Sequence, residues 1–275
     1  MSVSTIRRPR KLPADLTSFV GRERELPAVK RLLASHRLVT LTGPGGVGKT
    51  RVALRAADEV QWAFPDGVWF VELAGLHDPS LVPQTVADTL GIQGTAQNGP
   101  LESLVEFLRS RELLLVLDNC EHLVDACTAL AESLLRTCPE LRILATSRQL
   151  LQVEGEQVFQ VPPLPVPNAE QSGAPETLHK YAAVRLFAER AEAVRPGFAL
   201  DPSNQVAVSE ICRRLDGIPL ALELAASRLR ALSVHQLHER LDDRYALLTG
   251  GSPARLPRQQ TLRALIPWSY DLCSP

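Results

Sequence analysis

Residues 43–50 read Gly-Pro-Gly-Gly-Val-Gly-Lys-Thr, and this glycine-rich stretch constrains the fold more than any other part of the chain. It follows the β-prone run from Leu38 to Thr42. It precedes a segment, from Lys49 to about Val60, whose apolar residues recur at helical spacing. Glycine lets backbone amides turn inward around an anion without a side chain blocking close approach. The order of strand, glycine loop and helix therefore predicts a phosphate-binding loop (P-loop) at the start of a helix.

The residue types in the P-loop predict how it would bind a nucleoside triphosphate. The Lys49 ammonium would reach the β- and γ-phosphates, and the Thr50 hydroxyl would bind Mg²⁺. Amides at the start of the following helix add partial positive charge. We expect ATP or ADP with Mg²⁺, because the Asn-Lys-x-Asp motif for guanine is absent from the sequence. The residues expected to contact the nucleotide here are Gly43, Gly45, Gly46, Val47, Gly48, Lys49, Thr50 and Arg51.

Strand-like and helix-like segments alternate before the prolines at 162–167, which predicts an α/β domain with a central parallel sheet. Continuous rather than alternating hydrophobicity is typical of strands covered on both faces. The expected strands are Leu38–Thr42, Val68–Leu73, Leu113–Leu117 and Ile143–Thr146, with helices near Val82–Leu90 and Leu101–Leu108. The sequence thus predicts a P-loop NTPase fold of the ASCE type.

Four prolines, at positions 162, 163, 165 and 167, mark the clearest break in the chain, since they cannot continue a helix or a central strand. Beyond them, amphipathic segments at 181–193, 204–215, 220–232 and 234–241 predict a small all-helical domain. The expected organisation is a flexible basic leader (1–17), a nucleotide-binding domain (18–165), a helical domain (166–250) and a distinct last segment (251–275).

Asp118 follows the apolar run that ends at Leu117, where its carboxylate is expected to hold the same metal ion as Thr50, directly or through water. Asn119 stands where many ATPases of this arrangement place a second Asp or Glu as the base. An amide can orient the attacking water but cannot accept its proton. Glu121 is an alternative base if the loop turns suitably. Hydrolysis is therefore expected to be slow or conditional.

Arg148 comes directly after the fourth expected strand, in Thr146-Ser147-Arg148. If that strand lies between the P-loop strand and the Asp118 strand, the guanidinium would sit close to the γ-phosphate. A charge-assisted hydrogen bond could then distinguish ATP from ADP. The alternative is a surface arginine on a turn.

Five motifs occur in one order along the chain: Phe19-Val20-Gly21-Arg22-Glu23, the P-loop, Leu115-Val116-Leu117-Asp118-Asn119, Thr146-Ser147-Arg148 and Gly217-Ile218-Pro219-Leu220. Together they resemble the NB-ARC unit of STAND signalling ATPases, in particular bacterial LuxR-type and antibiotic-regulatory (AfsR/SARP-like) transcription regulators. The resemblance implies that Val20, Gly21 and Arg22 line the adenine and ribose side of the pocket and that Pro219 packs on the adenine. A simple helix start, which proline tolerates, is the other reading of Pro219.

The segment from Gln259 to Leu272 resembles the start of the winged-helix domain of that family. Because the chain stops at Pro275, the resemblance implies a truncated switch. Contact with DNA would then belong to missing C-terminal domains.

Bulk composition narrows the possible partners. A net charge of −1 gives no global field for nucleic acid or membrane. Five cysteines without CxxC spacing predict neither a disulfide framework nor a zinc site. The sequence has no signal peptide and no apolar run long enough to span a bilayer, so a cytoplasmic location is expected.

The leading functional hypothesis is a regulatory switch in which ADP holds the domains closed and ATP favours an open form that can self-associate. The alternative is a P-loop ATPase that turns over constitutively, and Asn119 argues against it. Direct DNA binding by this chain is disfavoured, because no helix-turn-helix is recognisable in the sequence.

Overall fold

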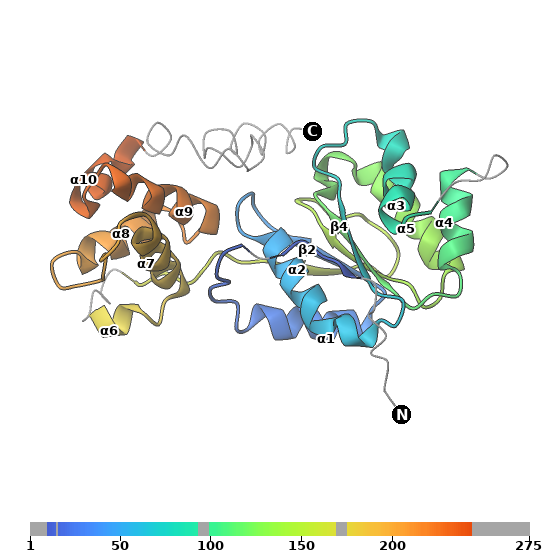
Figure 1. Ribbon diagram of the computed structural model, residues 1–275, viewed down its shortest axis with the longest axis horizontal. Helices are drawn as coiled ribbons and strands as arrows, with labels where there is room; N and C mark the ends of the chain where they lie inside the picture. The colour runs from blue at the N-terminus through green and yellow to red at the C-terminus, as the bar shows by residue number, and fades with distance from the viewer. Residues whose placement is uncertain (1–9, 15, 93–98, 169–174, 244–275) are drawn as a thin grey trace, which may run out of the picture. The chain divides into compact units, whose positions relative to one another are not determined.

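The computed structural model describes residues 10–14, 16–92, 99–168 and 175–243, and these residues form two compact units (Figure 1). Among the described residues, the first unit comprises 10–14, 16–18, 23–43, 49–92 and 99–161, and the second comprises 19–22, 44–48, 162–168 and 175–243. The tip of the P-loop, residues 44–48, thus groups with the second unit. The domain ranges expected from the sequence stay predictions. The segment 251–275 and most of the leader 1–17 lie outside the described residues.

The first unit is built on a parallel sheet with six strands among the described residues. Neighbouring strands pair in the order β1-β3-β4-β5-β2-β6, and every pair is parallel. The strands are β1 (Arg10–Lys11), β2 (Leu38–Thr42), β3 (Val68–Glu72), β4 (Leu114–Asp118), β5 (Arg142–Thr146) and β6 (Gln157–Gln160). This sheet confirms the predicted α/β P-loop NTPase fold.

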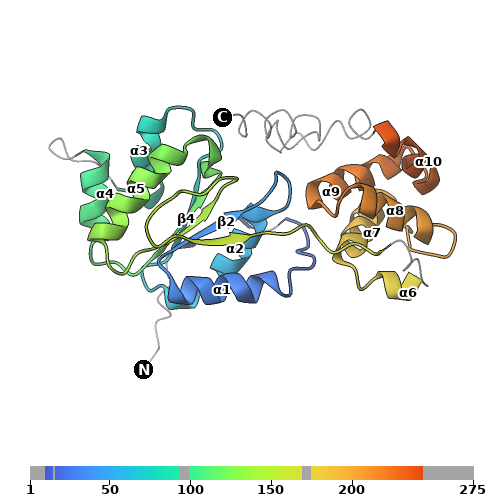
Figure 2. The ribbon, with the colours of Figure 1, turned by 180° about the vertical axis from the view of Figure 1, so that it is seen from behind.

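Helices cover both faces of the sheet (Figures 1 and 2). They are α1 (Glu25–Ser35), α2 (Lys49–Val60), α3 (Val82–Leu90), α4 (Pro100–Leu108) and α5 (Val124–Thr137). Leu115 and Ile143 belong to one buried cluster together with apolar residues of α3, α4 and α5. Val116 and Leu144 point to the opposite face, where α2 packs against β4 and β5. Burial on both faces explains why these strands are continuously apolar.

In the first unit, the expected elements agree with the structure to within about two residues at each end, which is the usual spread in defining helix and strand boundaries. Two helices, α1 and α5, and the two edge strands β1 and β6 are additional. The α5 sequence consists mostly of strong helix formers such as Ala and Leu, and packing of its buried face stabilises the helix further. In β6, exposed and half-buried residues alternate, as expected at a sheet edge.

The second unit is all-helical among its described residues, as predicted. Its helices are α6 (Pro175–Leu178), α7 (Ala182–Val194), α8 (Gln205–Arg214), α9 (Pro219–Ser227) and α10 (Val234–Glu239). One apolar cluster joins them, with the fully buried Phe187 contacting Phe198 edge to face at 6.4 Å between ring centroids. The single helix expected over 220–232 is wrong, because α9 ends at Ser227 and a 3-10 turn follows. No helix in the described part of the chain is long and apolar enough to cross a membrane.

Candidate functional site

Three adjacent strands bring the candidate residues together at their carboxyl ends, which form one edge of the sheet. β2 ends at Thr42 and continues into the P-loop, β4 ends at Asp118, and β5 ends at Thr146. β5 lies between β2 and β4, which is the strand order that the expectation for Arg148 required. Ligands in open parallel sheets bind outside the carboxyl ends of the strands. This edge is therefore the candidate site.

Asp118 is the centre of a buried hydrogen-bond network. Its side chain is almost fully buried, and its Oδ1 accepts hydrogen bonds from the Thr50 hydroxyl at 2.7 Å and the Thr146 hydroxyl at 2.6 Å. Its Oδ2 accepts from the Asn119 side-chain amide at 2.7 Å. The Thr146 hydroxyl in turn accepts from the Asn119 backbone N–H at 3.0 Å. The network orients the Asp118 carboxylate beside the hydroxyl of Thr50.

Burial raises the pKa of Asp118 above its ordinary value. Hydrogen bonds from Thr146 and Thr50 act in the opposite direction, and the nearby carboxylates of Glu121 and Glu72 add to the rise in pKa. Desolvation and like charges both disfavour the ionised form of a carboxyl group. A cation bound here would reverse that balance, because it favours the carboxylate.

At the base of the P-loop, the Lys49 side chain is buried and its Nζ donates to the Gly43 carbonyl oxygen at 2.8 Å. Gly48 has φ +97°, and a Cβ there would meet no atom within 4 Å. Backbone conformation rather than lack of space therefore calls for glycine at this position. Lys49 is also the first residue of α2, so the loop leads into a helix N-terminus as expected.

The tip of the P-loop is held by other residues of the second unit. The Arg22 guanidinium donates to the Val47 carbonyl oxygen at 2.8 Å and to the Pro162 carbonyl oxygen at 2.6 Å. The Leu220 backbone N–H donates to the Gly46 carbonyl oxygen at 3.2 Å. These donors orient two loop carbonyls. The sequence resemblance did not anticipate that Arg22 would bind the protein backbone.

The remaining residues expected at the nucleotide lie as follows. Val20 packs against the apolar cluster of the second unit, and Gly21 has φ +76°. Pro219 is the first residue of α9, in the helix-start position that proline tolerates. Arg51 donates from its guanidinium to the carbonyl oxygens of Thr17 and Ser18, at 2.9 and 3.0 Å. Contact of these residues with the nucleotide stays a prediction.

Arg148 and Glu121 form a buried ion pair next to the Asp118 network. Arg148 Nε lies 3.5 Å from Glu121 Oε1, and the two side chains are only 8% and 2% exposed. The alternative of a surface arginine is therefore wrong. Asn119 precedes the short 3-10 helix that carries Glu121 and has a left-handed backbone, with φ 63° and ψ 51°.

Thr146 is a site residue to which the sequence argument gave no role. Its position in the Thr146-Ser147-Arg148 motif, at the end of an apolar strand, is the signal that could have identified it. A polar residue there lies beside the polar end of the neighbouring strand, because the strands are parallel.

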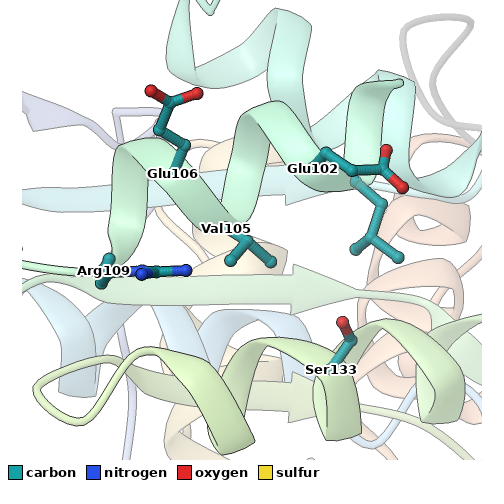
Figure 3. A pocket seen from close by; sticks show the side chains of 6 residues that line it. Glu102, Val105, Glu106, Arg109 and Ser133 are labelled. Atoms are coloured by element: carbon teal, nitrogen blue, oxygen red, sulfur yellow. The ribbon is translucent and has the colours of Figure 1, made fainter. Parts of the chain in front are cut away.

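Two hollows lie away from this site. One, of about 530 Å³, is lined by Leu101, Glu102, Val105 and Glu106 of α4, by Arg109, which follows α4, and by Ser133 of α5. Figure 3 shows Val105 and Ser133 facing each other while Glu106 points away. The other, of about 400 Å³, includes Lys30, Trp62 and Arg142 in its lining. No candidate nucleotide residue lines either hollow.

The parallel sheet and the residues at the carboxyl ends of its strands show that the chain has a P-loop NTPase fold. Two solved structures carry the same fold: a signal transduction ATPase with numerous domains (STAND) protein with a tetratricopeptide repeat sensor from Pyrococcus horikoshii and the Aeropyrum pernix ORC2 protein. Their TM-scores are 0.52 and 0.50 at 18% and 15% identity. The match covers 87% of this chain and 34% of the STAND protein, and 83% of this chain and 70% of the ORC2 protein.

Sequence comparison narrows the class. Residues 33–154 match the family model of an AAA domain. A Mycobacterium tuberculosis protein named as an HTH-type transcriptional regulator is 46% identical over 244 residues, which are 89% of this chain and 26% of that protein. An uncharacterized protein of the same species is 43% identical over 259 residues, 94% of this chain and 63% of the relative. The regulatory protein AfsR of Streptomyces coelicolor is 31% identical over 243 residues, 82% of this chain and 22% of AfsR.

The chain thus spans about a quarter of the named regulators and 63% of the uncharacterized relative. The matches support a P-loop ATPase domain of the kind found in transcriptional-regulator-like proteins. Nucleotide binding is the property expected of such a domain.

Proposed function

We propose that this chain is the ATP/ADP-binding switch module of a STAND-type signalling ATPase or transcription regulator, with slow or conditional hydrolysis. The observation that carries the proposal is the hydrogen bond of 2.7 Å between the Thr50 hydroxyl and the Asp118 carboxylate. It joins the end of the P-loop to the end of β4. The names of two relatives, HTH-type transcriptional regulator and regulatory protein AfsR, favour a regulatory protein.

The residues at this edge fit a magnesium nucleotide. Thr50 and Asp118 supply oxygen ligands, which Mg²⁺ prefers, and a bound cation would oppose the burial that raises the pKa of Asp118. Bound Mg²⁺ would neutralise charge on the phosphate oxygens. Lys49 would exchange its hydrogen bond to the Gly43 carbonyl for a phosphate oxygen. Arg148 would sense the γ-phosphate, and Asn119 would orient water without accepting a proton.

The contacts at the tip of the P-loop suggest how the nucleotide could act on the second unit. Phosphates bind to loop amides, and the carbonyls of Gly46 and Val47 in the same loop accept from Leu220 and Arg22. A change in loop geometry would therefore be felt at the start of α9. A switch also requires that ADP and ATP differ in affinity for the two states.

The wider organisation belongs to the same proposal. It comprises an NB-ARC-like unit with domains at 18–165 and 166–250, self-association in the ATP form, and a cytoplasmic location. DNA contact would be made through domains of a longer protein. The alternative, a constitutive ATPase, predicts steady turnover.

Nucleotide extraction from freshly purified protein tests the proposal. We expect bound ADP at close to one per chain, and little nucleotide on Lys49→Ala, because the buried ammonium is its main phosphate contact. Phosphate release measured in parallel should be slow. Sustained turnover near the low end of usual enzyme rates, about 1 s⁻¹, would overturn the switch in favour of a constitutive ATPase. Equal nucleotide content on Lys49→Ala would refute the assignment of the P-loop.

A further inference from the structure

Glu121 and Arg148 form a charged pair where apolar packing would be more stabilising. Their side chains are 2% and 8% exposed, and their charged atoms lie 3.5 Å apart. Removing two charges from water carries a large desolvation cost. Apolar residues of similar size are therefore often at least as stabilising as a buried ion pair. Glu121 Oε2 is in addition buried without a hydrogen-bond partner among the described residues. A buried carboxylate oxygen left in this state calls for an explanation beyond folding.

The position of the pair relates it to the candidate site. The 3-10 helix Cys120–His122, which carries Glu121, follows β4 and packs against β5. The Glu121 carboxylate is close enough to Asp118 to contribute to the raised pKa of that residue. Glu121 is thus an ionisable group beside the residues that would hold the metal and phosphates.

Asn119 cannot supply the missing base. Its side-chain amide already donates to Asp118 Oδ2 at 2.7 Å, and an amide does not accept a proton from water near neutral pH. Glu121 is the nearest carboxylate along the chain after Asp118, and one of its oxygens has no partner among the described residues.

We propose that Glu121 is the general base for ATP hydrolysis and that its ion pair with Arg148 keeps it inactive until the γ-phosphate attracts the guanidinium. This inference rests on the proposed function. In the reaction, a water oxygen bonds to the γ-phosphorus while the bond from that phosphorus to the bridging oxygen breaks. The water proton passes to Glu121 and then to solvent, leaving ADP and inorganic phosphate. Slow, conditional hydrolysis follows, because Arg148 must first leave Glu121.

The base assignment is tested with Glu121→Gln, which keeps the shape of the side chain. The control is Glu132→Gln, the same change at an exposed carboxylate of α5 outside the site. Glu121→Gln should slow phosphate release by about 100-fold or more, and Glu132→Gln by less than about 2-fold. After incubation with ATP and gel filtration, Glu121→Gln should retain ATP, whereas the parent retains ADP.

Each other outcome has one meaning. Equal losses in the two variants, or a Glu121→Gln rate above about a tenth of the parent rate, would overturn the base assignment. So would a parent chain that binds nucleotide but hydrolyses no faster than Lys49→Ala. A parent chain that binds no nucleotide would overturn the proposed function itself.

The inactivating ion pair is tested by binding alone. If Arg148 must leave Glu121 to reach the γ-phosphate, removing the Glu121 charge should strengthen binding of a non-hydrolysable ATP analogue by about 3- to 10-fold. ADP affinity should stay within about 2-fold, since ADP does not require that exchange. Equal changes for both nucleotides would refute the inactivating role of Arg148.

The ligand-free chain gives a second readout by urea denaturation. Arg148→Met alone should lower the midpoint more than the Arg148→Met, Glu121→Gln double variant, because the single change leaves an unpaired buried charge. The exposed pair Glu132 and Arg136, with side chains 41% and 77% exposed, is the matched control, and its shifts should add. Additive shifts for Glu121 and Arg148 would show that the two charges are not coupled.

Discussion

Thr146→Val tests whether the Asp118 network stabilises the folded chain. Valine has nearly the shape of threonine but lacks the hydroxyl, which donates to Asp118 Oδ1 at 2.6 Å and accepts from the Asn119 N–H at 3.0 Å. Thr146 is 1% exposed, so water cannot replace the lost group without rearrangement. The substitution therefore removes two hydrogen bonds and creates little cavity.

The expected cost follows from these two contacts. A hydrogen bond to a charged group contributes about 1.5–3 kcal/mol and a neutral one about 0.5–1.5 kcal/mol. The added methyl group returns about 0.8 kcal/mol of apolar burial. The free energy of unfolding should thus fall by about 2–3 kcal/mol at pH 7. For a domain of about 150–250 residues this lowers Tm by roughly 4–12 °C.

Urea denaturation followed by tryptophan fluorescence measures this change, since Trp62 and Trp69 both lie in the first unit. Thr137→Val is the control, because the exposed Thr137 hydroxyl has only local partners, the Ser133 and Leu134 carbonyls of its own helix and the adjacent Cys138 sulfur. It should change stability by less than about 0.5 kcal/mol. A Thr146→Val loss no larger than that of the control would refute a stabilising role for the network.

The same substitution has a defined pH dependence. Removing the Thr146 hydroxyl removes one cause that lowers the pKa of Asp118, so the folded-state pKa rises further. A carboxyl group with a raised folded pKa destabilises the protein as pH rises above the unfolded pKa, about 3.9, and the penalty is complete above the folded pKa. The loss from Thr146→Val should therefore be larger at pH 7 than at pH 5.

Three further substitutions test other parts of the site. Asp118→Asn should unfold at the same or a higher urea concentration than the parent at pH 7, and the difference should shrink toward acid pH. The same variant should lose Mg²⁺-dependent nucleotide binding. Lower stability of the variant at pH 7 would contradict the raised pKa of Asp118. Gly46→Ala should weaken nucleotide binding at least about 10-fold, because φ is +77° and a Cβ would lie 2.9 Å from Leu220 Cβ, whereas Gly75→Ala, with open space around it, should not. Arg22→Gln should weaken ADP binding about 10-fold in a titration, which is the effect of losing one charge-assisted hydrogen bond. Arg31→Gln is the exposed control. Equal affinities of the two variants would show that Arg22 does not hold the loop.

Much of the fold could be predicted because its causes are local. Two-sided burial leaves continuous apolar runs in β4 and β5, and the glycines mark where β2 ends. α5 was not expected, although most of its residues are good helix formers and its buried residues Cys127, Leu130, Ala131 and Leu134 recur at helical spacing. The position of β5 between β2 and β4, on which the role expected for Arg148 depends, could not be predicted, because the pairing of distant strands leaves no local signal.

The residue types in the motifs indicated the candidate site, but the hydrogen-bond partners of the site residues could not be predicted from residue type. Asp118 could be assigned to a strand end, whereas its hydrogen bond from Thr146 depends on the register of β4 with β5. Arg22 could be assigned to a motif, whereas its bonds to the Val47 and Pro162 carbonyls join segments far apart in sequence. Long side chains choose partners in three dimensions, so sequence spacing does not determine them.

Burial of the charged side chains at this site lowers the stability of the folded chain. Asp118 is buried with a raised pKa, Lys49 is buried beside a backbone carbonyl, and one oxygen of Glu121 lacks a partner among the described residues. Folding alone would favour apolar residues at such positions. A bound magnesium nucleotide would offset these costs, because a cation favours the Asp118 carboxylate and phosphate oxygens accept from Lys49. The stability gained on binding should therefore exceed that expected from contact area alone, which is why retention of nucleotide through purification is the most direct consequence of this site.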